Sequence, residues 1–329
     1  MLRIIQGLEL YLKKLERLFY FQMIRNKGVC CIVLSLEDDD PFCKFKTITY
    51  KRFSSLPREE ALFKLGEIIL HNLWVTRAAI DYCGTHGHNY RLSSNVFPLL
   101  TYDKADLDLY CLPQFREIFN ELDLIADKRE KLNVRLSSHP DQFNVLASDN
   151  AEAVTRTIRE LDFHGWFMSR IGCPLSYEAP INIHVNRSAQ SDDARKSVRD
   201  LFYKNFEKLS DDVKKRLVLE NDDKAAGWTV AELFDYFDRP EIPITFDYLH
   251  HKCHPGAGYF AQEAQAFLLA HDTWRTKPHI PLFHYSESIP ENKNPRKHAD
   301  YATKLPDTYG QKIDLDFEFK MKEKSFQNL

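Results

Sequence analysis

The chain has little glycine, 11 residues among 329, and lacks the glycine-rich loops that bind nucleotides. No P-loop, G-x-G-x-x-G or G-x-S-x-G pattern occurs, so a nucleotide cofactor and a serine-hydrolase mechanism have no support. No apolar run approaches the roughly 20 residues that a membrane span needs. The net charge of −3 gives no indication for or against nucleic acid. We therefore expect a protein that uses no nucleotide cofactor and binds no membrane.

The seven cysteines are scattered and form no C-x-x-C pair. Such a set suits a reducing compartment and argues against a disulfide framework or a structural zinc knuckle. Residues 1–22 interleave leucines with charged residues, which breaks any signal-peptide core. We expect a cytoplasmic protein with an amphipathic N-terminal extension over residues 1–22 and a single catalytic domain over residues 23–329.

Strand-like apolar runs alternate with helically spaced segments about eight times, without a linker or a shift in composition. The predicted strands are Val29–Leu36, Asn89–Ser94, Asn133–His139, Ile181–Val185, Leu217–Asp222, Ile244–His250, Leu282–Ser286 and Asp314–Lys320. The predicted helices are Arg58–Tyr82, Pro113–Lys131, Asn150–Gly172, Asp192–Lys215, Thr229–Tyr236, Tyr259–His271 and Lys297–Thr303. This alternation predicts an α/β fold, a closed (β/α)8 TIM barrel, with a doubly wound open sheet as the alternative.

Imidazole and carboxylate side chains recur near the C-terminal ends of these strands. A parallel barrel brings such ends together, so side chains far apart in sequence can meet around shared cations. A single histidine is more often a hydrogen-bonded structural residue, and only the agreement among strands favours ligation. Mixed nitrogen and oxygen ligands suit Mn²⁺, Zn²⁺ or Fe²⁺. The predicted set is His139, His184, Glu220, Asp247, His250, His284 and Glu318.

Glu220 ends an apolar strand, where an uncompensated carboxylate would cost several kcal/mol to bury. A lysine partner or a divalent ion would compensate this charge, and the converging histidines favour the ion. Several ions together suit phosphoryl chemistry, and we expect Glu220, His139 and Asp247 to be catalytic. Sugar isomerisation on a two-metal barrel is the rival reaction.

Short motifs in a fixed order resemble the UV-damage endonuclease family over roughly residues 24 to 324. They are YRLSS at 90–94 with FP at 97–98, SHPDQF at 138–143, NIHV at 182–185, LENDD at 219–223, FD at 246–247 with HH at 250–251, HYS at 284–286, HADY at 298–301 and EFKMK at 318–322. The resemblance implies a barrel like that of endonuclease IV, with two or three divalent ions. Manganese is the implied metal, and zinc or magnesium are alternatives.

The implied activity is DNA repair: hydrolysis of the phosphodiester 5′ to a UV photoproduct in damaged double-stranded DNA, by a monomer. The resemblance adds His298 to the ligands and makes Glu220 a bridge between two ions. It makes Gln142 and Phe143 the wedge that probes the duplex, with core packing as the alternative role for Phe143.

The chain departs from the family pattern at several positions: Val29, Val33, Tyr102, Leu282 and the pair Asn186-Arg187. Most implied ligands are kept, while several implied substrate contacts are replaced. This indicates a divergent member. A sugar isomerase and a non-catalytic relative that binds damaged DNA are the alternatives.

Overall fold

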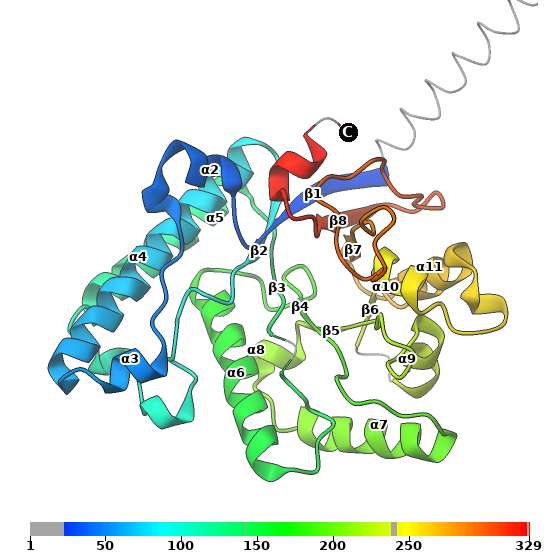
Figure 1. Ribbon diagram of the computed structural model, residues 1–329, viewed down its shortest axis with the longest axis horizontal. Coiled ribbons are helices and arrows are strands. Elements are labelled where there is room, and N and C mark those ends of the chain that lie inside the picture. Colours follow the sequence, from blue (N-terminus) through cyan, green and yellow to red (C-terminus); the bar gives the residue numbers. More distant parts are fainter. Residues whose placement is uncertain (1–22, 142, 238–241, 328) are drawn as a thin grey trace, which may run out of the picture.

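Eight parallel strands form the barrel of the computed structural model, which describes residues 23–141, 143–237, 242–327 and 329 (Figure 1). Their order is β6-β5-β4-β3-β2-β1-β8-β7. A parallel bridge between Asp247 and His284 joins the two end strands and nearly closes the ring. The predicted TIM barrel is confirmed. The strands are β1 (Ile24–Cys30), β2 (Asn89–Leu92), β3 (Leu136–Ser138), β4 (Ile181–Ile183), β5 (Leu217–Glu220), β6 (Ile244–Thr245), β7 (Leu282–Tyr285) and β8 (Ile313–Phe317).

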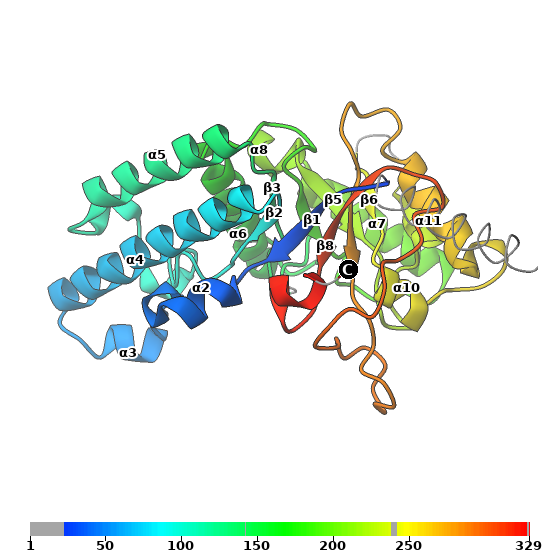
Figure 2. The same cartoon turned by 90° about the horizontal axis from the view of Figure 1, so that it is seen from above.

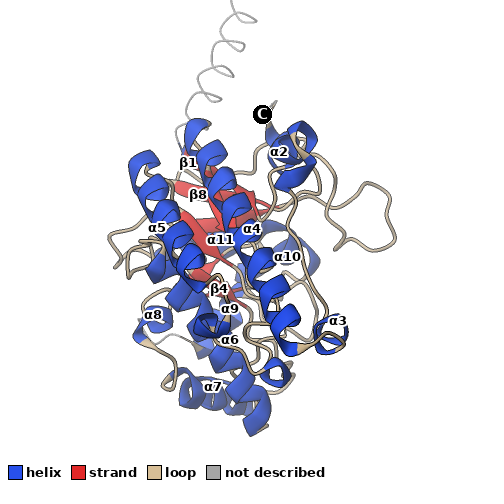
Figure 3. Cartoon of the chain, turned by 90° about the vertical axis from the view of Figure 1, so that its left-hand side faces the viewer, coloured by secondary structure: helices blue, strands red, loops and turns tan. Residues whose placement is uncertain are grey.

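Helices surround the strands on the outside of the barrel, and α4 and α5 run side by side (Figures 2 and 3). The predicted helix Asn150–Gly172 corresponds to α6, and both of its ends show typical capping. The Asn150 side chain accepts from the Ala153 amide at 3.1 Å, and Gly172 takes a left-handed φ of +74° just after the helix. The helices are α2 (Leu34–Asp39), α3 (Tyr50–Ser54), α4 (Arg58–Thr85), α5 (Phe115–Leu132), α6 (Ala151–Arg170), α7 (Asp192–Phe206), α8 (Asp211–Lys214), α9 (Val230–Tyr236), α10 (Tyr248–Cys253) and α11 (Glu263–Asp272).

The first predicted strand, Val29–Leu36, is wrong in its position. β1 begins five residues earlier, and its polar start pairs with β8. The end of the apolar run instead opens α2, because the buried Glu323 carboxylate accepts from the amides of Leu34 and Ser35 at 3.1 and 2.6 Å. This cap comes from the short 3-10 helix η5 (Lys322–Phe326), almost 290 residues away in sequence.

Two other predicted elements need correction. Ile244–His250 is not one strand, since Asp247 caps α10 by accepting from the His250 amide at 2.6 Å. Lys297–Thr303 is not a helix, because His298 forms an antiparallel bridge with Ser288 and the Ala299 amide donates to Glu287. The first segment therefore ends in a short helix and the second is a loop after β7.

A buried ion network fills the opposite end of the barrel. Arg135 donates to Asp314 at 2.6 Å and to the Ile280 carbonyl at 2.8 Å, and Arg25 donates to the same carboxylate. Burial alone would raise the pKa of Asp314, but the hydrogen bonds and charges of Arg25 and Arg135 bring it below its ordinary value. The charged residues at this end of the barrel are therefore paired with one another, and the predicted site residues lie at the other end, the barrel mouth.

Residues 1–22, the predicted N-terminal extension, lie outside the described residues. Among the helices that the structure describes, none is both long and apolar enough to span a membrane.

Candidate metal centre

The barrel mouth gathers the predicted ligands around Glu220, whose side chain is 1% exposed. His139 Nε2 lies 3.1 Å from Glu220 Oε2, His284 Nδ1 lies 3.1 Å from the same oxygen, and His250 Nδ1 lies 3.0 Å from Glu220 Oε1. His184 Nε2 is 3.8 Å from Oε1. Three imidazoles at strand ends and a fourth, His250, in the first turn of α10 thus surround one carboxylate.

Three overlapping groups of these side chains could hold a metal ion. In each group the potential ligand atoms lie within 4.8 Å of one another. Glu220 belongs to two groups and Asp247 to two, so neighbouring ions would share a carboxylate. The groups are His139 with His184 and Glu220, Glu220 with Asp247 and His250, and Asp247 with His284 and Glu318.

The buried charges of the cluster shift the pKa values of its members. Burial would raise the pKa of Glu220, but His284 and His184, with His139 and His250 nearby, hold it well below its ordinary value. Burial would lower the pKa of His284, yet the charges of Glu220 and Glu318 raise it to about 9. The buried carboxylates and imidazoles thus stabilise one another's charged forms. A set of deprotonated ligands around divalent ions would give a similar balance of charge.

Three buried polar atoms at the centre make no hydrogen bond of ordinary geometry among the described residues: Glu220 Oε1, Asp247 Oδ2 and His284 Nδ1. Two of them, Glu220 Oε1 and His284 Nδ1, lie in the ion pairs described above, but buried polar atoms that make no hydrogen bond are rare in folded proteins. All three are atoms of the types that bind metals, a carboxylate oxygen or an imidazole nitrogen, and they belong to residues of the candidate groups. The residues present therefore fit divalent ions.

Neighbouring groups fix the orientation of the imidazoles. His184 Nδ1 lies 2.9 Å from Asp222 Oδ1, and Asp222 is itself held by the Trp228 amide at 2.8 Å. His250 Nδ1 is 2.9 Å from the Asn221 carbonyl. Asn182 donates to Glu220 Oε2. Such contacts set the ring orientation and so prepare the opposite nitrogen for a ligand.

Arg91 belongs to the centre, although the sequence analysis assigns it no chemical role. Its guanidinium, buried in β2, donates to Glu318 Oε1, which is also 3.2 Å from His284 Nδ1. Burial would raise the pKa of Glu318, but the charge of Arg91 lowers it well below its ordinary value. A signal was present in the sequence, because a charged residue between Tyr90 and Leu92 on a buried strand requires a partner of opposite charge.

Of the remaining predicted site residues, His298 and Phe143 lie at the rim. His298 Nδ1 is bonded to the Glu318 backbone carbonyl, so its ring adjoins the cluster without belonging to one of the three groups. Phe143 is 84% exposed, which excludes core packing for its side chain. Gln142 lies outside the described residues.

Three of the six departures from the family pattern are buried. Val29, Val33 and Leu282 are each less than 5% exposed. Tyr102 is 40% exposed, and its ring contacts that of Tyr50 at 5.1 Å. It belongs to none of the three candidate groups.

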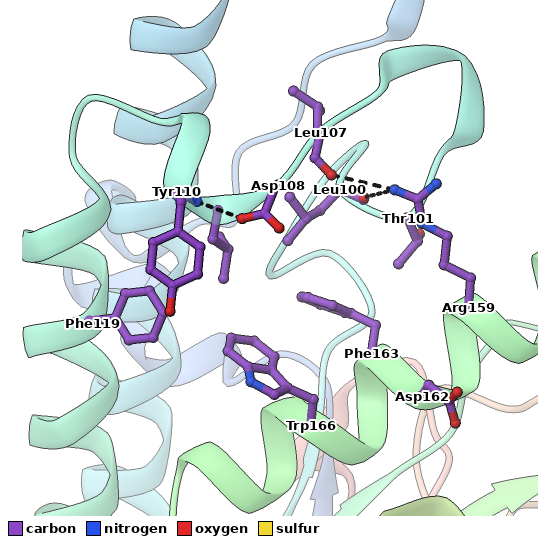
Figure 4. A pocket seen from close by; sticks show the side chains of 11 residues that line it. Leu100, Thr101, Leu107, Asp108, Tyr110, Phe119, Arg159, Asp162, Phe163 and Trp166 are labelled. Atoms are coloured by element: carbon purple, nitrogen blue, oxygen red, sulfur yellow. Dashed lines mark hydrogen bonds between the residues drawn. The ribbon is translucent and has the colours of Figure 1, made fainter. Parts of the chain in front are cut away.

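A separate aromatic hollow of about 470 Å³ lies between α5, α6 and the loop after β2 (Figure 4). Tyr110, Phe119 and Trp166 form its walls. Its charged groups are already engaged, since Arg159 donates to the Leu100 and Leu107 carbonyls. None of the described predicted site residues lines it, so the chemistry belongs to the barrel mouth.

Comparison with known proteins gives one consistent result. The family model described as UV-endonuclease UvdE matches residues 25–329. A UV DNA damage endonuclease of Nostoc sp. is 32% identical over 305 residues, covering 92% of this chain and 88% of that protein. One of Bacillus thuringiensis subsp. konkukian is 30% identical over 297 residues, covering 90% and 84%. The crystal structure of SacUVDE matches with a TM-score of 0.72 at 29% identity, covering 91% of this chain and 94% of that one. The chain belongs to the UV-endonuclease UvdE family, as the sequence motifs predict.

Proposed function

We propose that this chain is a metal-dependent DNA repair endonuclease that hydrolyses the phosphodiester 5′ to a UV photoproduct in duplex DNA. The observation that carries the proposal is the convergence of three histidine and carboxylate groups in the barrel mouth. The relatives named UV DNA damage endonucleases supply the substrate class.

Each of the three groups would bind one ion. His139, His184 and Glu220 would hold one ion, Asp247 and His250 with Glu220 a second, and His284 and Glu318 with Asp247 a third. His298 would complete this set through its Nε2 atom, since its Nδ1 is engaged. We propose manganese as the metal.

Divalent ions in such a site lower the pKa of water and stabilise the charge that develops on phosphate oxygens. The protein side chains would hold these ions and keep their ligands in position. Glu220, His139 and Asp247 would fix the ligand geometry, and the Asp222 carboxylate would keep the His184 ring in one orientation. Arg91 would hold Glu318 in place and prevent this carboxylate from swinging toward solvent. Because Glu220 and Asp247 are buried, these electrostatic contacts would be stronger than at an exposed site.

Phe143 would enter the duplex at the lesion together with Gln142. An exposed aromatic ring at the rim of a nuclease site can stack on a base in the gap left by flipped nucleotides. A photodimer pairs and stacks poorly, so the cost of opening the duplex is lowest there.

The test uses purified full-length protein, end-labelled duplexes with one thymine dimer or none, and MnCl₂ or EDTA. The expected result is one Mn²⁺-dependent nick 5′ to the dimer, with a 3′ end that a polymerase extends. His139→Ala should abolish nicking, while His86→Ala, a histidine exposed at the end of α4, should not. No nicking of either duplex by protein with bound metal would refute the proposal. Lesion-dependent binding without nicking would support a non-catalytic relative instead.

A further inference from the structure

The loop that carries Phe143 is fixed by its backbone rather than by its ring. We call residues 143–149 the Phe143 loop; it lies between β3 and α6. Because the Phe143 side chain is 84% exposed, packing of the ring cannot hold it in place. The position of the ring therefore depends on its neighbours in the loop, through the buried side chains of Leu146 and Ala147 and through what binds the main chain.

The segment after β4 provides two of these contacts. Asn186 Nδ2 donates to the Asn144 carbonyl at 3.0 Å, next to Phe143. The Arg187 guanidinium donates to the Ala147 carbonyl at 3.0 Å and lies 3.2 Å from Asp149 Oδ2. Both ends of the Phe143 loop are thus attached to one neighbouring segment.

That segment is itself well anchored. The Arg187 carbonyl accepts from the indole of the fully buried Trp228 at 2.9 Å. Asn186 has a φ of +54°, a left-handed conformation that asparagine tolerates better than most residues and that directs its amide toward the loop. The segment begins two residues after His184, a member of the candidate metal groups. It therefore connects the metal centre directly to the Phe143 loop.

We propose that Asn186 and Arg187 are positioning residues that hold Phe143 at a fixed place relative to the metal centre and thereby set the preference for lesions. The inference rests on the proposed function. A loop that is ordered before DNA binds loses little conformational entropy when its ring enters the duplex. A loop that must order on binding would weaken insertion at the lesion, and cleavage would depend less on damage.

Two variants remove the contacts with little other change. Asn186→Gly removes the amide donor and keeps the left-handed backbone accessible. Arg187→Met keeps an unbranched stem and removes the guanidinium. Arg170→Met is the matched control, because Arg170 likewise bonds one carboxylate, Asp123, and one backbone carbonyl, Phe119, at the far end of α6.

The first measurement is hydrogen exchange on the protein without DNA. The Val145 amide donates to the Thr157 hydroxyl at 3.0 Å and the Asn144 amide donates to the Asp141 carbonyl at 3.2 Å, so both should be protected. In Asn186→Gly and Arg187→Met their exchange should be about tenfold faster, as expected for a lost hydrogen bond, with no such change in Arg170→Met. Unchanged exchange would overturn the proposal.

The second measurement is the ratio of nicking rates on dimer-containing and undamaged duplexes. Both variants should lower this ratio about tenfold, while a dimer placed in a pre-opened bubble should be nicked at the wild-type rate. Metal content should not change. Faster exchange with an unchanged ratio would overturn the role in lesion preference. If the wild type nicks no DNA, the proposed function fails, and the exchange rates alone still decide whether the pair fixes the loop.

Discussion

Replacement of Phe143 by alanine separates damage recognition from folding and from metal binding. The side chain is 84% exposed, so its removal uncovers no core and leaves no cavity. Surface substitutions of this kind change the free energy of unfolding by less than about 0.5 kcal/mol. Phe143 is also absent from the three candidate metal groups, so the ion content should not change.

The loss should instead be seen in cleavage of damaged DNA. Stacking of one base on an aromatic side chain contributes about 1–3 kcal/mol. With a tenfold change for each 1.4 kcal/mol, Phe143→Ala should lower kcat/KM on a dimer-containing duplex about 5- to 150-fold. Nicking of undamaged DNA should change little, because an intact stack does not admit the ring.

The assay compares both substrates at several enzyme concentrations, with thermal unfolding and metal content measured on the same preparation. Phe63→Ala is the control, since Phe63 is 55% exposed on α4, in the outer layer of helices. An equal fall on damaged and undamaged duplexes would refute the reasoning. So would a fall in melting temperature of several degrees, because the ring would then be a structural residue.

Three further outcomes follow from the structure. Glu220→Gln should bind at least one ion fewer by elemental analysis, and its nicking rate should be at least about a hundredfold lower. Loss of a group that only hydrogen-bonds to a metal ligand already lowers metal affinity or activity about 10- to 100-fold. Full metal content in this variant would contradict the assignment. Mn²⁺ at a hundred times its Kd should stabilise the protein by about 2.7 kcal/mol in urea unfolding, and His184→Ala should weaken the effect; equal stability in EDTA and Mn²⁺ would count against the site. Asp314→Asn should cost about 3–5 kcal/mol at pH 7 because it removes the buried carboxylate that Arg25 and Arg135 share and leaves them only Glu178, at 3.7 and 3.9 Å. The pKa of Asp314 is lowered in the fold, so this contribution is complete above the unfolded value of about 3.9 and disappears as the pH falls through the folded pKa; a difference independent of pH would contradict the argument.

The sequence predicts the barrel well because strands and helices there follow local patterns. It fails where a distant group decides the local structure. Leu34–Leu36 continues an apolar run, yet it is helical because the Glu323 carboxylate from the far end of the chain caps it. No local signal at residues 29–36 contains this information.

The error at the centre has the opposite origin, because a local signal was missed there. His250 was expected at a strand end and lies instead in the first turn of α10, because Asp247 forms a helix cap. An aspartate before a short apolar segment is a typical capping signal, so this correction was available from the sequence. The convergence on Glu220 was nevertheless predicted, because strand order alone brings these side chains to one mouth.

The departures from the family pattern bear on how such a chain would select its substrate. Val29, Val33 and Leu282 are buried, so these positions offer DNA no polar contact. Discrimination must then depend on groups that solvent, and hence DNA, can reach. Phe143 is such a group, and its backbone is held by Asn186 and Arg187. On the proposed function, selectivity should then follow how well a lesion admits an aromatic ring rather than which base is damaged, and an abasic site should be nicked about as well as a dimer.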